Sequence, residues 1–143
     1  MITVTHVRGD RMAIRIRGHD LVADQPMDAG GEDAGPTPTE LFVASLAACV
    51  GFYAERFLRR HAPDVGLSVT CDFAMSTDRP SRVASVDLRI DLPVPLRADL
   101  RDALLRAVDH CTVHNSLRTP PAVRMEIRDS VTAPVGTGSD GGM

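Results

Sequence analysis

Residues 37–63 have the sequence TPTELFVASLAACVGFYAERFLRRHAP, and this stretch decides the fold. Thr37 and Glu40 have the spacing of a capping box, in which each side chain accepts the other residue's backbone N–H, and Pro38 suits the first helical position. The apolar residues that follow cover almost the whole circumference of a helix. We therefore predict a helix that begins here, ends at Ala62-Pro63, and is surrounded by protein on most sides.

The segments on either side of this helix alternate between apolar and polar residues, as strands do. Residues 25–36 are rich in Gly, Pro and Asp and are predicted to form a loop. The order β-β-(β)-α-β-β-α-β indicates an α+β fold. Its further predicted elements are strands at residues 2–4, 12–16, 21–23, 67–75 and 84–92, a helix from Pro95 through Cys111, and a last strand at Val123–Ile127.

Length and composition narrow the functional classes. The 143 residues suit one domain, predicted at residues 1–130, with a disordered tail at residues 131–143. A net charge of −3 and a pI near 5.9 argue against nucleic acid or an anionic membrane as the main partner. The absence of a continuous apolar run of about 18 residues and of a signal-peptide pattern predicts a soluble, cytoplasmic protein. All 16 basic residues are Arg, whose planar guanidinium suits oxygen ligands.

The three cysteines, Cys49, Cys71 and Cys111, are far apart in sequence and lack Cys-x-x-Cys spacing. This pattern indicates thiol chemistry or burial, and it is not typical of a disulfide framework. Cys49 lies about three turns into the predicted helix, too deep for the helix dipole to activate it. A reactive thiolate at Cys49 therefore requires a nearby cation, for which Arg is the available choice.

Each of these residues also has a plain structural interpretation. A free cysteine in an apolar helix is more often a small core residue, which applies to Cys49, and even more to Cys71 on an alternating strand. For Cys111 the structural and the functional interpretation are both open. Two helices packed side by side could bring Cys111 against Cys49. Cys111, His114, His110 and Cys49 give only a weak zinc pattern, because no second ligand pair has the required spacing. Glu40 could be a catalytic carboxylate, but its capping position explains it equally well.

Several segments taken together resemble a known family. They are DxP at 24–26, GGxDxGPTPTEL at 30–41, ASLAAC at 44–49 and CTVHNSL at 111–117. This combination is similar to the OsmC/Ohr family of organic hydroperoxide and osmotically inducible proteins, with Thr112 in place of the Pro in the family's Cys-Pro-Val-His segment. The resemblance extends over residues 1 to about 130.

The resemblance implies a fold in which two central helices pack against antiparallel sheets and two chains form an intertwined homodimer. It implies that Cys49 is the peroxidatic thiol and Cys111 the resolving thiol. Cys49 would be oxidised by an organic hydroperoxide, and the resulting disulfide would be reduced by an external dithiol. An Arg from the N-terminal hairpin, Arg8 or Arg11 with Arg17 as a weaker candidate, would activate Cys49. Neither a metal nor another cofactor is implied.

One departure from the family pattern favours a second hypothesis. Thr39 stands where Ohr members carry a Glu, one place before Glu40. The Arg–Glu pair of the Ohr site is then lost, weakened or rebuilt through Glu40. The alternative function is a non-peroxidatic dimer of the same fold that binds a small molecule or senses redox state. A weaker third option is acyl or thioester chemistry at Cys49 with His110 or His114 as the base.

Overall fold

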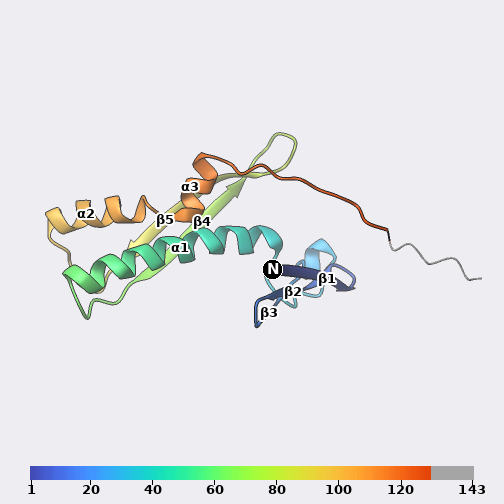
Figure 1. The fold of residues 1–143 in the computed structure, drawn as a ribbon, viewed down its shortest axis with the longest axis horizontal. Coiled ribbons are helices and arrows are strands. Elements are labelled where there is room, and N and C mark those ends of the chain that lie inside the picture. The colour runs from blue at the N-terminus through green and yellow to red at the C-terminus, as the bar shows by residue number, and fades with distance from the viewer. Residues whose placement is uncertain (130–143) are drawn as a thin grey trace, which may run out of the picture.

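The computed structural model describes residues 1–129 of the chain. Its elements are β1 (Ile2–Arg8), β2 (Arg11–Ile16), β3 (His19–Ala23), the 3-10 helix η1 (Met27–Ala29), α1 (Pro38–His61), β4 (Ser68–Met75), β5 (Val83–Asp91), α2 (Ala98–Val108) and α3 (Thr112–Arg118). The three α-helices and the antiparallel strands confirm the α+β fold. The strands form two separate sheets, β1-β2-β3 and β4-β5 (Figure 1).

The long helix α1 begins where its capping residues predict. The Thr37 hydroxyl accepts the Glu40 N–H at 3.2 Å, and a Glu40 carboxylate oxygen accepts the Thr37 N–H at 2.7 Å. Pro38 occupies the first turn, where its missing N–H has no intrahelical partner to lose. The helix ends at His61, and the Ala62 N–H still donates to the Leu58 carbonyl.

One face of α1 lies on the β4–β5 hairpin and forms the core. Its buried residues recur every three or four positions: Val43, Leu46, Val50, Ala54 and Leu58. The hairpin is antiparallel, with its register running from Ser68↔Asp91 to Met75↔Val83. Its inward side chains include Val69, Val86, Leu88 and Ile90. Each large aliphatic side chain buried here contributes about 1.5–3 kcal/mol, which holds helix and hairpin together.

No part of residues 1–129 covers the opposite face of α1. We call Ala44, Ser45, Ala48 and Phe52 the outer face; all four are exposed, Phe52 at 55%. The prediction that protein surrounds α1 is therefore wrong for a single chain. By length and composition alone α1 is long and apolar enough to cross a membrane, and only 28% of its most apolar 18-residue window is buried. Its outer face is available to another apolar surface.

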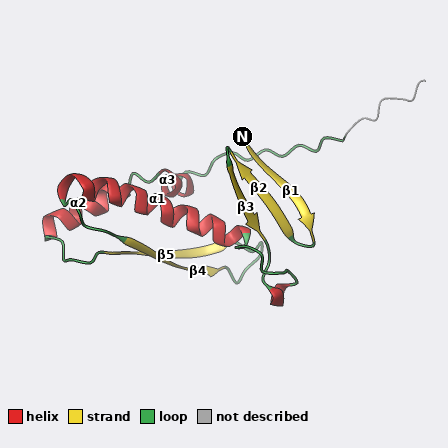
Figure 2. Cartoon of the chain, turned by 90° about the horizontal axis from the view of Figure 1, so that it is seen from below, coloured by secondary structure: helices red, strands yellow, loops and turns green. Residues whose placement is uncertain are grey.

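The three-stranded sheet lies beside the N-terminal end of α1, apart from the β4–β5 hairpin (Figure 2). β1 and β2 pair from Ile2↔Ile16 to Arg8↔Arg11, and β2 and β3 from Met12↔Ala23 to Ile16↔His19. Every residue of β1 is exposed, including Ile2, Val4 and Val7. This sheet has exposed apolar side chains, and no other element of the described part of the chain forms a layer over them.

Two sequence predictions need correction in the C-terminal part. The helix predicted from Pro95 through Cys111 begins at Ala98 and ends at Val108, and α3 starts separately after Cys111. The strand predicted at Val123–Ile127 does not form, and Val123, Met125 and Ile127 are 77%, 93% and 91% exposed. A strand requires a neighbouring ladder of hydrogen bonds, and no described strand lies along this segment. The tail predicted at residues 131–143 lies outside the described residues.

Candidate functional site

The structure places Cys49 and Cys111 together, although 61 residues separate them in the chain. Cys111 is fully buried and forms an apolar cluster with Leu46 and Val50, against which the half-buried Cys49 packs. Burial raises the pKa of the Cys111 thiol, and its interaction with the Cys49 thiol adds to this. Both sulfurs are free thiols in this structure.

The break between α2 and α3 creates this arrangement. Cys111 is the N-cap of α3, with φ −54° and ψ 119°, and its sulfur accepts the His114 N–H at 3.5 Å. This contact works against the rise in the pKa of Cys111. The Tyr53 hydroxyl lies 3.4 Å from the Thr112 hydroxyl, which links α1 to the first turn of α3. Had α2 continued through Cys111, as the sequence pattern suggested, this capping contact would be lost.

The third cysteine lies elsewhere. Cys71 is half-buried on β4, opposite Leu88 of β5. Burial raises the pKa of its thiol, and the nearby Asp72 and Asp87 carboxylates raise it further. A thiol that resists ionisation is a poor nucleophile, so the structural interpretation of Cys71 is the one its surroundings favour.

The two candidate arginines lie in the N-terminal sheet and are held by an acidic residue that the sequence analysis missed. Glu32 accepts one hydrogen bond from Arg8 at 2.8 Å and one from Arg11 at 2.6 Å through the same oxygen. Among residues 1–129, no ion pair or hydrogen bond joins either arginine to a cysteine. The sequence feature that could have predicted these contacts is the acidic, Gly-rich loop that follows the hairpin. Acidic residues next to a basic hairpin can form ion pairs with it.

A second missed residue, Asp24, organises that loop. It is 1% exposed and accepts the N–H groups of Gln25 at 2.9 Å, Ala34 at 3.1 Å and Glu32 at 3.3 Å. Burial by itself raises the pKa of Asp24, but these donors and the Arg11 charge outweigh it, so the pKa lies below its ordinary value. The Arg11 Nε is 3.8 Å from Asp24 and is buried without a hydrogen-bond partner.

Glycines allow the loop to close around Asp24. A side chain at Gly31 would overlap the Gln25 carbonyl, and one at Gly35 would overlap the Val22 carbonyl. The tight loop therefore fixes Glu32 opposite the hairpin. The sequence analysis considered Glu40 as the replacement for the missing Ohr carboxylate, but in this structure Glu40 caps α1 and Glu32 contacts the arginines.

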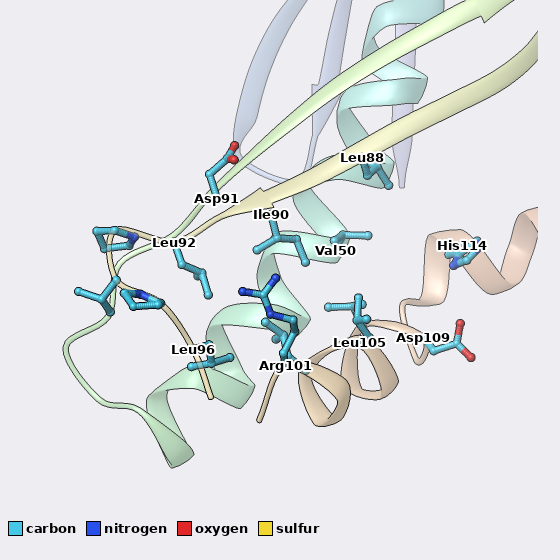
Figure 3. Close-up of a pocket in the computed structure, with 15 residues that line it drawn as sticks. Val50, Leu88, Ile90, Asp91, Leu92, Leu96, Arg101, Leu105, Asp109 and His114 are labelled. Carbon is cyan, nitrogen blue, oxygen red and sulfur yellow. The ribbon is translucent and has the colours of Figure 1, made fainter. Parts of the chain in front are cut away.

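Apolar hollows adjoin the thiol cluster. The larger, about 790 Å³, lies between β5, α2 and α1 (Figure 3). The Arg101 guanidinium projects into it near Ile90 and Leu105, while Asp109 and His114 lie at one end. A smaller hollow of about 480 Å³ shares Leu88 and His114 with it. Neither is lined by a cysteine, so both adjoin the thiols without containing them.

The zinc pattern weighed from the sequence finds no support in the geometry. Within residues 1–129, no three His, Cys, Asp or Glu side chains gather so that they could hold a metal ion. His110 lies in the break between α2 and α3, and His114 lies on α3, but they do not join Cys49 and Cys111 in a ligand set.

Comparison with known proteins supports this fold. The sequence model of the family described as OsmC-like protein matches residues 30–126. A Psychrobacter arcticus protein whose name refers to osmotic stress induction and detoxification has a TM-score of 0.73 at 24% identity, over 80% of this chain and 85% of that one. No curated protein matches this chain in sequence.

Two further solved structures carry a more specific name. The organic hydroperoxide resistance protein OsmC of Legionella pneumophila has a TM-score of 0.63 at 19% identity, over 82% of this chain and 88% of that one. The organic hydroperoxide resistance protein OhrB of Bacillus subtilis has a TM-score of 0.60 at 20% identity, over 84% and 92%. At these sequence identities the similarity shows a shared fold.

Proposed function

This chain belongs to the OsmC-like protein family, and from that premise we propose that it is a thiol-dependent peroxidase that reduces organic hydroperoxides. The observation that carries the proposal is the Cys49–Cys111 pair: one thiol half-buried, the other fully buried, in one apolar cluster. Some structures of this fold carry the name organic hydroperoxide resistance protein, which supports the same chemistry.

The proposed reaction proceeds through two oxidised states of Cys49. The Cys49 thiolate attacks the terminal oxygen of the hydroperoxide, the O–O bond breaks, and the alkoxide leaves as an alcohol after taking a proton. Cys49 is then a sulfenic acid. The Cys111 sulfur attacks it, water leaves, and a Cys49–Cys111 disulfide forms. An external dithiol supplies the two electrons that restore both thiols.

The surroundings of the pair suit an unequal division of roles. Cys111 is fully buried, and burial raises the pKa of its thiol, so it is the less suited of the two to attack an incoming peroxide and is left for the second step. Cys49 is the more accessible of the two and can meet a peroxide first. The apolar neighbours Leu46 and Val50 favour an organic hydroperoxide over the smaller, more polar hydrogen peroxide.

The working unit in this proposal is a cytoplasmic homodimer. Three features of the described residues support the homodimer: the exposed outer face of α1, the exposed N-terminal sheet, and the alternating segment at residues 123–127, whose apolar side chains are exposed. The arginine requirement points the same way. Arg8 and Arg11 belong to the three-stranded sheet, which lies apart from the helices that carry the thiols of the same chain (Figure 2). The hairpin of one protomer would therefore supply the cation to Cys49 of its partner.

Turnover of cumene hydroperoxide with dithiothreitol tests the proposal. Cys49→Ser should reduce turnover at least about 100-fold, because a hydroxyl cannot replace the thiolate nucleophile. Cys71→Ser is the matched control and should retain the wild-type rate. Cys111→Ser should still be oxidised by one equivalent of peroxide but accumulate as sulfenic acid. Wild-type turnover by Cys49→Ser would sink the proposal.

One observation favours the alternative of a small-molecule binding protein. The 790 Å³ hollow is large enough for an organic ligand, and it contains no sulfur atom. If binding is the function, ligands should raise the melting temperature of the wild type and of Cys49→Ser equally. Peroxide turnover would then be negligible in both proteins.

A further inference from the structure

A group of basic side chains lies between the C-terminal half of α1 and the end of α2. We call Arg56, Arg60, His61 and His110 the basic patch; all four are exposed. We propose that the basic patch docks the acidic surface of the dithiol protein that reduces the Cys49–Cys111 disulfide. This inference rests on the proposed peroxidase function and identifies the surface chemistry of its electron donor.

The basic patch surrounds a small cavity. A cavity of about 260 Å³ is lined by Tyr53, Phe57 and Ala107 together with the four basic residues, and none of these lining residues carries a carboxylate. The Phe57 and His61 rings stack with centroids 4.2 Å apart, and the His61 Nδ1 lies 2.9 Å from the Phe57 carbonyl oxygen. The Arg56 guanidinium lies 5.3 Å from the centre of the Phe52 ring. Aromatic rings thus hold two of the basic groups in place.

The charges of the two arginines are not neutralised by the rest of the described chain. Among residues 1–129, neither Arg56 nor Arg60 forms an ion pair, whereas the neighbouring Glu55 is paired with Arg59 at 3.5 Å. Asp109, next to His110, is paired with Arg118 at 2.7 Å. What distinguishes this cavity is that two such guanidinium groups and two imidazoles line it together, with no carboxylate among its lining residues. Its electrostatic complement is an acidic surface.

The basic patch is continuous with the thiol pair. Cys49, Tyr53, Arg56 and Arg60 are spaced at i, i+4, i+7 and i+11, so they share one stripe of α1. Tyr53 packs against the cluster that contains Cys111, and His110 directly precedes Cys111. A protein docked on the patch would therefore hold its thiols near the half-buried Cys49 rather than at a remote surface.

The chemistry of the step defines what the partner must carry. A partner thiolate attacks the Cys49 sulfur, because Cys111 is fully buried, and the Cys111 sulfur leaves as a thiolate that takes up a proton. The second partner thiolate then attacks the mixed disulfide at the partner's own sulfur. Cys49 leaves as a thiolate, the partner is released as a disulfide, and two electrons have passed to this protein. The partner therefore needs two thiols to reduce the disulfide and acidic side chains around them to bind the basic patch.

Two synthetic dithiol peptides test the proposal on the full chain. One has a Cys-Gly-Pro-Cys segment flanked by two Glu on each side, and the other has the same segment flanked by Lys. The disulfide is formed with diamide in a Cys71→Ser background, so that no peroxide is needed. The rate constant for reduction by each peptide is divided by its rate constant with a small neutral disulfide, which removes differences in thiol reactivity. The protein variants are Arg56→Gln/Arg60→Gln and, as a control, Arg79→Gln/Arg82→Gln, which removes two exposed charges from the β4–β5 connection.

We expect the normalised rate of the acidic peptide to exceed that of the basic peptide by about ten-fold at low salt, and to approach it in 1 M salt. Arg56→Gln/Arg60→Gln should lower the acidic-peptide rate about five-fold, and the control variant should leave it unchanged. Equal normalised rates for both peptides, or equal effects of the two double variants, would overturn the docking proposal. Failure of peroxide to oxidise Cys49 would sink the peroxidase function while leaving this comparison measurable.

Discussion

Replacing Glu32 by Gln isolates the contact that holds the two candidate arginines. Glu32→Gln keeps the size of the side chain but removes the charge that pairs with Arg8 at 2.8 Å and with Arg11 at 2.6 Å. The Arg8 and Glu32 side chains are 64% and 53% exposed, and the Arg11 side chain is 24% exposed. Ion pairs with this exposure contribute about 0.5 kcal/mol each, so the loss in stability should be about 1 kcal/mol. For a domain of this size, that lowers the melting temperature by about 3 °C.

The effect on chemistry should follow from the same free energy. If Glu32 orients Arg11 toward a thiol across the proposed dimer, losing about 1 kcal/mol of positioning slows oxidation of Cys49 about five-fold. Single-turnover oxidation by cumene hydroperoxide, followed by loss of free thiol, measures this rate. Thermal unfolding at low and high salt measures the stability change, which should shrink as salt screens the pairs.

A matched variant in the same sheet separates the two effects. Asp20→Asn breaks the Arg15–Asp20 pair, whose two hydrogen bonds are 2.8 and 3.2 Å long and which lies at the opposite end of the β2–β3 ladder from Arg11. Asp20→Asn should lower the melting temperature without slowing Cys49 oxidation. Equal oxidation rates for Glu32→Gln, Asp20→Asn and the wild type would refute a positioning role for Glu32.

Two further outcomes are expected. Ala48→Glu places a charge on the outer face of α1, so it should convert the proposed dimer to monomer, as measured by light scattering at about 10 μM. The control Glu55→Gln, at the edge of that face, should leave the dimer intact. A monomeric wild type would contradict the dimer. The lowered folded-state pKa of Asp24 means that its ionised carboxylate stabilises the fold above its ordinary pKa of 3.8, and that this stabilisation is lost as the pH falls through the folded value. Urea unfolding between pH 3 and 7 should show this acid loss in the wild type and a flatter profile in Asp24→Asn.

The helix α1 shows how much local chemistry can predict. The reciprocal contacts of Thr37 and Glu40, the position of Pro38 and the end of the helix near Ala62-Pro63 all follow from residues within a few positions of each other. The alternating strands β4 and β5 follow equally from their period of two. Such signals are readable because the interacting groups are close in the chain, so their geometry depends little on the rest of the fold.

The α2–α3 break shows where local patterns fail. The spacing from Leu96 to Cys111 is compatible with one continuous helix. However, α2 ends at Val108, and α3 begins only after Cys111. The contacts that favour the break are long-range: Cys111 packs against Leu46 and Val50, and Thr112 meets Tyr53. Val123–Ile127 has a strand pattern but no neighbouring strand among the described residues, because pairing depends on what lies beside a segment.

The sequence by itself determined the α+β order and the capped central helix, because each rests on residue type and short spacing. The candidacy of Cys49, Cys111, Arg8 and Arg11 came from the resemblance of several sequence segments to the family. Only the tertiary structure decided that the two thiols meet at a helix break, that Glu40 caps a helix, and that Glu32 and Asp24 hold the arginine hairpin. These contacts join residues far apart in the chain. Their geometry arises from packing and loop closure, which no local pattern encodes.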